Sequence, residues 1–191
     1  PRLCRDWSSD VCSSDLCTEE KGYQTGLTIA RGSPSSGVGG GLCQFTNLIH
    51  WLILHTPLEI VEHHHHDGLD LFPDYGRQIP FGTGTSIMYN YFDYRFKNTT
   101  DQPFQLIVYT TDEYLCAEIR SDKPLSVKYH IKSEGDRFVQ AGSDVFREGK
   151  VFRYIIDKTS GSCLSKELIK ENYAKVMYPI EETKVVAEKF V

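Results

Sequence analysis

The sequence predicts an α+β fold in which one central helix packs on a mostly antiparallel sheet, with a C-terminal extension rich in β-hairpins. Three observations predict this class. Residues 44–55 have helical length and one apolar stripe. Residues 58–133 contain several β-rich runs separated by turn signals. The last third of the chain alternates short strand-like segments with further turn signals.

The first predicted elements are a short strand at residues 27–30 and a loop at residues 31–41 that is dense in glycine, serine and proline. The helix follows at residues 44–55. Its apolar residues recur at the spacing of one helix face, at Phe45, Leu48, Ile49, Leu52 and Ile53. Thr56-Pro57 ends the helix, because the residue before a proline is pushed out of the helical region.

Residues 58–66 are predicted to form an extended strand. Successive side chains of a strand point to opposite faces, so Glu62, His64 and His66 are expected to share one face. His63 and His65 are then expected to point the other way, toward solvent.

The remaining elements are predicted to be strands. Residues 84–133 form a meander of about four strands, with a turn at residues 97–101. Further turns are predicted at residues 148–150 and 160–162, so hairpins follow. Residues 164–174 could be a helix by propensity, although the alternation favours a strand.

The N-terminal segment differs from the rest of the chain. Residues 5–16, RDWSSDVCSSDL, correspond in frame to most of a common sequencing adapter. We therefore expect residues 1–16 to be non-native and the native sequence to start near Cys17, in a gene truncated at its N-terminus. The remainder is predicted to be one domain, with its main part at residues 17–121 and an extension at residues 122–191.

Composition limits the possible partners. The formal net charge of −5 and the absence of basic blocks argue against a nucleic-acid partner. No run of about eighteen apolar residues exists, so a membrane span is not indicated in this segment and we expect it to be soluble. The cysteine spacings contain no CxxC or zinc-ribbon pattern.

Several motifs resemble those of the VanW family. They are the Lys21-Gly22-Tyr23 segment, the GGGLCQ box at residues 39–44, the Glu62-x-His64-x-His66 element and the Asp93–Asn98 segment. The resemblance spans residues 17–121. It implies an association with glycopeptide resistance or the cell envelope of a bacterium, in the cytoplasm or at the envelope, and it implies no particular reaction.

Two positions depart from the family's pattern. Family members often have arginine where this chain has His63, and often have Asp-Ala-Thr where it has Gly84-Thr85-Ser86. The resemblance therefore implies that a carboxylate common in the family is missing here.

One hypothesis for this region is a cysteine-dependent hydrolase or transferase acting on peptidoglycan-type amides. Cys43 lies at a helix start, where free N–H groups and the helix dipole favour a thiolate nucleophile. His64 or His66 would act as its base, and Gln44 would donate to an oxyanion. In the alternative interpretation, Cys43 is a small core residue after a tight turn.

The competing function is a non-catalytic module that binds peptidoglycan, its precursors or a partner protein. The candidate binding residues are Gly39, Gly40, Gly41, Glu62 and Asp67, with exposed aromatic side chains expected at Tyr89, Tyr91 and Tyr94. No cofactor is predicted. Zinc held by His64, His66 and Glu62 is the alternative, because imidazole and carboxylate groups are common zinc ligands.

Overall fold

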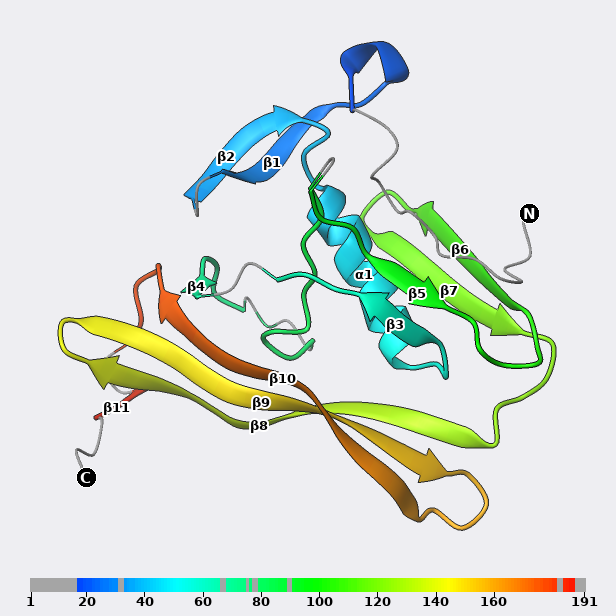
Figure 1. Ribbon diagram of the computed structural model, residues 1–191. Helices are drawn as coiled ribbons and strands as arrows, with labels where there is room; N and C mark the ends of the chain where they lie inside the picture. The colour runs from blue at the N-terminus through cyan, green and yellow to red at the C-terminus, as the bar shows by residue number, and fades with distance from the viewer. Residues whose placement is uncertain are drawn as a thin grey trace.

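The computed structural model describes residues 17–30, 33–65, 68–74, 76, 79–88, 91–181 and 184–187 of this 191-residue chain. Within these residues, sheet dominates and one α-helix lies near the centre (Figure 1). This arrangement is consistent with the predicted α+β class. The elements are η1 (Glu19–Lys21), β1 (Thr25–Ala30), β2 (Ser33–Val38), α1 (Leu42–Leu54), β3 (Glu59–Glu62), β4 (Leu69–Asp70), β5 (Arg95–Lys97), β6 (Phe104–Thr110), β7 (Leu115–Ser121), β8 (Val127–Ala141), β9 (Asp144–Asp157), β10 (Cys163–Val176) and β11 (Val185–Ala187).

Helix α1 organises the hydrophobic core. It starts two residues before the predicted position, and its apolar stripe is buried at Ile49 and Ile53. Burying one such side chain contributes about 1.5–3 kcal/mol, so this face anchors the helix. The stripe packs with residues that come from three later segments. The buried cluster consists of Ile49, Ile53, Leu58, Tyr94, Phe96 and Phe104.

The prediction of a single sheet over residues 58–133 is wrong. Strand β3 pairs with β5, β6 pairs with β7, and β8 joins a separate five-stranded sheet. The turn predicted at residues 97–101 is confirmed, since the Asn98 side chain donates to the Gln102 carbonyl at 2.8 Å and accepts from the Thr100 N–H at 3.0 Å. This tight turn follows only three residues of β5, which limits that strand's pairing to β3.

The predicted loop at residues 31–41 also needs correction. Residues 33–38 form β2, which pairs antiparallel with β1 in a two-stranded ribbon (Figure 1). Proline and glycine, which both occur in β2, are poor strand formers in general, and pairing with β1 overrides that local preference. Residues 31 and 32, between the strands, lie outside the described residues.

The large sheet has the strand order β11-β8-β9-β10-β4. The predicted C-terminal hairpins are confirmed, since β8, β9 and β10 run antiparallel as long neighbours. Residues 164–174 form part of strand β10, as the alternation pattern favoured. The predicted turn near residues 160–162 is present, and it joins β9 to β10.

The turn predicted at residues 148–150 is absent, because these residues continue strand β9. Opposite them, the register of β8 shifts between Glu134 and Arg137. A Cβ atom on Gly149 would lie 3.0 Å from the Cα atom of Asp136. The glycine therefore marks a bulge where two backbones approach closely, and it does not mark a chain reversal.

A buried arginine joins β9 to the segment that contains β4, the strand at one edge of the same sheet. Arg147 of β9 donates two hydrogen bonds to Asp136, at 2.8 and 2.7 Å, and one to Asp74 at 2.8 Å. A third carboxylate, Asp70, lies 3.6 Å from its Nη1 atom. Burial alone would lower the pKa of Arg147, but the hydrogen bonds to Asp136 and Asp74 raise it, so the guanidinium stays charged.

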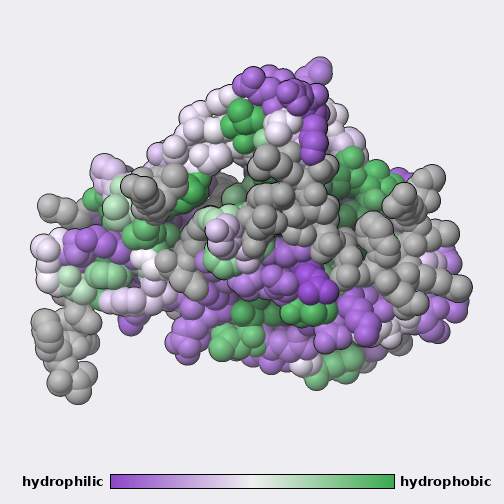
Figure 2. Space-filling model, turned by 45° about the horizontal axis from the view of Figure 1, so that its top comes forward, coloured by the Kyte–Doolittle hydropathy of each residue, from purple (hydrophilic) through white to green (hydrophobic). Residues whose placement is uncertain are grey.

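The described surface carries a patch of hydrophilic side chains over η1, at the top of the view in Figure 2. None of the helices in the described part of the chain combines the length and apolar character needed to cross a membrane.

Candidate functional site

The glycine box forms a compact turn between β2 and α1. Gly39 and Gly41 have φ angles of +76° and +92°, in the left-handed region that favours glycine. Gly40 lies against the backbone of β1, where an added Cβ atom would be 2.1 Å from the carbonyl carbon of Gly26. Because Gly40 has no Cβ atom, the turn can pass closer to the backbone of β1 than any other residue at this position would allow.

A cavity of about 540 Å³ lies beside this turn. It brings together the three predicted binding glycines and the first turn of α1. Among the described residues, its lining consists of Tyr23, Gln24, Thr25, Gly39, Gly40, Gly41, Leu42 and Phe45. The prediction had not included Tyr23 and Gln24, which precede β1, or Thr25, which begins it, because their proximity depends on the fold of the β1–β2 ribbon.

Cys43 occupies the first turn of α1, as the spacing predicted. Burial raises the pKa of its thiol, and a backbone hydrogen bond from Ile87 offsets that effect only in part. Among the described residues, no imidazole hydrogen-bonds to this thiol. Gln44 is exposed at the helix surface. These features keep Cys43 in its neutral form and do not support the thiolate hypothesis.

His64 is paired with a carboxylate. Its Nε2 atom lies 2.9 Å from Oε1 of Glu62, which also accepts the Asp93 N–H at 3.2 Å. Arg95 lies 3.6 Å from the other Glu62 oxygen. The hydrogen bond to His64 is the main cause that lowers the pKa of Glu62. The predicted grouping of Glu62 with His64 is therefore present.

The prediction that His63 and His65 are solvated is wrong. The His63 ring stacks on buried His50 with 4.2 Å between ring centroids, and the His65 ring lies 4.1 Å from that of His63. Strand β3 ends at Glu62, so strict alternation does not continue into the histidines. The result is a histidine column formed by His50, His63 and His65.

Tyr94 closes the buried end of the histidine column. Its hydroxyl lies 3.0 Å from Nδ1 of His50, and the ring is fully buried. The expectation that Tyr94 is exposed for ligand recognition is therefore wrong, whereas Tyr91 is 77% exposed. Tyr89 lies outside the described residues.

Residues 84–86 run alongside the histidines. The Gly84 carbonyl lies 3.1 Å from Nε2 of His63, and the Ser86 N–H donates to the His64 carbonyl at 2.8 Å. The Thr85 N–H donates to the Asn47 side chain at 2.6 Å. The two positions that depart from the family's pattern, 63 and 84, thus contact each other. The contact of Asn47 with residues 84–86 was not predicted from the sequence. The position of Asn47 on the predicted helix was the only indication that the sequence offered.

Across the described ranges, no three His, Cys, Asp or Glu side chains form a group that could hold a metal ion. His66 and Asp67, which complete the zinc and binding hypotheses, lie outside those ranges. Only the His64 and Glu62 pair of the proposed ligands is described.

The chain is similar to one family and to two curated proteins. Residues 14–120 match the family described as VanW like protein. The chain is 30% identical over 166 residues to the Vancomycin B-type resistance protein VanW of Enterococcus faecalis, covering 87% of this chain and 60% of that protein. It is 30% identical over 89 residues to the Uncharacterized protein YoaR of Bacillus subtilis, covering 45% of this chain and 26% of that protein.

No solved structure matches the chain. The chain spans less than two thirds of the length of either curated relative.

Proposed function

This chain belongs to the VanW family, and from that membership we propose that it is an accessory protein of glycopeptide resistance or of another bacterial cell-envelope process. The name of the relative from Enterococcus faecalis supports the connection to vancomycin resistance.

At the molecular level, we propose a binding module for a fragment of peptidoglycan or its precursors. The cavity of about 540 Å³ beside the glycine turn is the observation that carries this proposal. Sites for small ligands are typically concave, with apolar walls and a few polar groups. Here Tyr23, Leu42 and Phe45 supply apolar surface, while Gln24 and Thr25 supply polar side chains.

Gly41 suits a ligand that has its own backbone. The space where its Cβ atom would lie is open, so a peptide segment can approach its backbone closely, whereas the corresponding space at Gly39 and Gly40 is filled by Cys17 and Gly26. The neighbouring rings of Tyr23 and Phe45 offer flat apolar faces. This combination fits the short peptides of the cell wall.

The hydrolase alternative has less support. A cysteine nucleophile needs a lowered thiol pKa or an adjacent base, and burial raises the pKa of Cys43. His64 is hydrogen-bonded to Glu62, the carboxylate of its own segment. We therefore propose that Cys43 is structural and that the cavity beside the glycine turn binds without chemistry.

The test is calorimetric titration of the chain with purified soluble muropeptides. We expect Leu42→Trp, which fills the cavity with an indole, to weaken binding at least tenfold, or about 1.4 kcal/mol. Tyr23→Ala is a second cavity variant that does not change α1. Leu168→Trp is the matched control, because Leu168 is 53% exposed on β10, and it is expected to bind like the wild-type chain.

Cys43→Ser separates the two functions. Unchanged muropeptide binding with no cleavage products supports the binding module. Cleavage by the wild-type chain that disappears in Cys43→Ser would replace it with the hydrolase. Equal binding by Leu42→Trp and Leu168→Trp would show that the glycine-turn cavity is not the site.

A further inference from the structure

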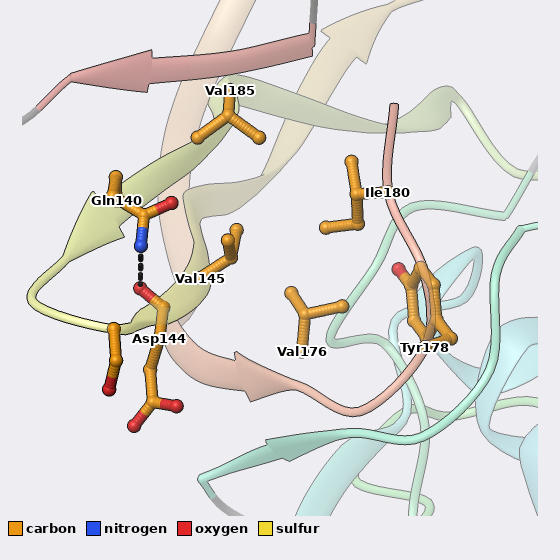
Figure 3. A pocket seen from close by; sticks show the side chains of 8 residues that line it. Gln140, Asp144, Val145, Val176, Tyr178, Ile180 and Val185 are labelled. Carbon is orange, nitrogen blue, oxygen red and sulfur yellow. Dashed lines mark hydrogen bonds between the residues drawn. The ribbon is translucent and has the colours of Figure 1, made fainter. Parts of the chain in front are cut away.

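The large sheet differs at its two ends. At one end, a second cavity, of about 530 Å³, lies among aliphatic side chains of β9, β10, β11 and the segment after β10 (Figure 3). The polar side chains of Gln140 and Tyr178 lie on opposite sides of this cavity, so they do not form one polar site. At the other end, which contains the β9–β10 turn at the lower right of Figure 1, the first half of β8 carries a row of basic side chains.

The row consists of Lys128, His130 and Lys132. Side chains two residues apart on a strand share one face of the sheet, so these three point to the same side. The register places His130 opposite Tyr154 of β9, and the Lys132 ammonium lies 5.8 Å from the centre of the Tyr154 ring. Both lysines of the row are exposed. The row is therefore open to a ligand that lies along β8.

The charges of this face leave the row with a positive excess. The two carboxylates that follow the row in the register are each paired with a lysine of a neighbouring strand. The pairs are Glu134 with Lys166, at 2.9 Å, and Glu171 with Lys150, at 3.0 Å. Across the described ranges, no carboxylate forms an ion pair with Lys128 or Lys132. The row therefore keeps two ammonium groups that can pair with an anionic ligand.

The spacing of the row matches that of a linear chain of phosphates. Six backbone bonds separate Cα atoms two residues apart, and they span about 6.6 Å in a strand. Six bonds also separate successive phosphorus atoms in a chain of 1,3-linked glycerol phosphate, so its extended repeat is about 7 Å. Three consecutive phosphates of such a chain can accept hydrogen bonds from Lys128, His130 and Lys132 in turn.

The aromatic rings of this face favour a phosphate chain that has no bases. The Lys166 ammonium lies 4.0 Å from the centre of the Phe152 ring and 5.4 Å from that of the Tyr154 ring. Single-stranded nucleic acids bind through bases that stack on open aromatic faces. Because lysine side chains already lie over these two rings, bases gain little here. The phosphates carry the binding, and a chain of polyol units between them fits beside the row.

We propose that this face of the large sheet binds a linear polyol phosphate, namely 1,3-linked poly(glycerol phosphate), along β8. The formal net charge of the chain is −5, so the attraction comes from the local positive excess and decreases steeply as salt screens it. The site does not depend on the function proposed for the glycine turn.

The test is an NMR titration of the full chain with a synthetic hexamer of 1,3-linked glycerol phosphate. We expect saturable shifts of the His130 ring signals and of the β8 amide signals. The dissociation constant is expected to rise roughly sevenfold between about 50 and about 200 mM salt, as for two phosphate contacts. Monomeric glycerol phosphate, which makes a single contact, is expected to bind at least tenfold more weakly. A thymidine hexanucleotide has the same phosphate repeat and is expected to bind no more tightly than the hexamer.

Two double variants locate the site. Lys128→Gln with Lys132→Gln is expected to weaken hexamer binding at least fivefold and to remove most of its salt dependence. Lys97→Gln with Lys123→Gln is the matched control, because it removes the same charge from two exposed lysines at other places in the fold. Equal affinity of the two double variants, equal affinity for the hexamer and the monomer, or shifts confined to other strands would each overturn the proposal. Tighter binding of the hexanucleotide would overturn it in favour of a nucleic-acid surface.

Discussion

Replacing Arg147 with methionine is expected to reduce the free energy of unfolding by about 3–5 kcal/mol. The guanidinium is 5% exposed, and its removal leaves Asp70, at 4% exposure, together with Asp74 and Asp136 without their shared cation. The cost arises mainly at Asp70, the buried one of the three carboxylates, and it exceeds the value of an ordinary surface ion pair. Urea unfolding at pH 7 measures it.

Arg137→Met is the matched control for that experiment. Arg137 is on β8, and it is 59% exposed and pairs with Glu148, so its loss is expected to cost at most about 1 kcal/mol. Adding Asp136→Asn to Arg147→Met should restore part of the lost stability, since it removes one unpaired charge. Similar unfolding free energies for the two arginine variants would contradict the role assigned to Arg147.

Acidification is expected to destabilise the protein through His50. Burial, then the charges of His63 and His65, lowers the pKa of His50 from 6.5 to about 3. Between these values the unfolded chain binds the proton and the folded chain does not, so stability falls as pH falls through this window. The slope is up to about 1.4 kcal/mol per pH unit, or roughly 2 kcal/mol lost between pH 6.5 and pH 5.

Two measurements check this expectation. The ring signals of His50 in NMR spectra should not titrate between pH 7.5 and pH 5. Urea unfolding of His50→Gln should give a pH dependence that is flatter by about 2 kcal/mol between pH 7 and pH 5, whatever its stability at pH 7. A His50 ring that titrates near pH 6, or parallel pH profiles for the two proteins, would show that the folded protein accepts the proton.

Local patterns in the sequence predicted part of this fold well. Helix α1 follows from an apolar stripe within one segment, and β10 follows from alternation that pairing with its long neighbour β9 reinforces. Both depend on residues close together in the chain. The single sheet over residues 58–133 could not be predicted correctly, because strand partners depend on packing between distant segments.

The candidate site shows the same limit. The pairing of Glu62 with His64 follows from a spacing of two residues. By contrast, the contact between His50 and Tyr94 joins residues 44 positions apart, and the strand pattern stops before His63. The raised pKa of Cys43 depends on burial by the surrounding fold, which its position at a helix start does not reveal.

The pairing of β4 with β10 also bears on how the protein folds. Leu69 lies opposite Lys175 in a parallel register, and Tyr178 reaches Asp70 across 108 positions of the chain. Contacts of such high sequence separation form slowly, because a long loop must close before they contribute stability. We expect the segment around β4 to acquire protection from hydrogen exchange late in refolding, after the β8–β9–β10 hairpins are in place.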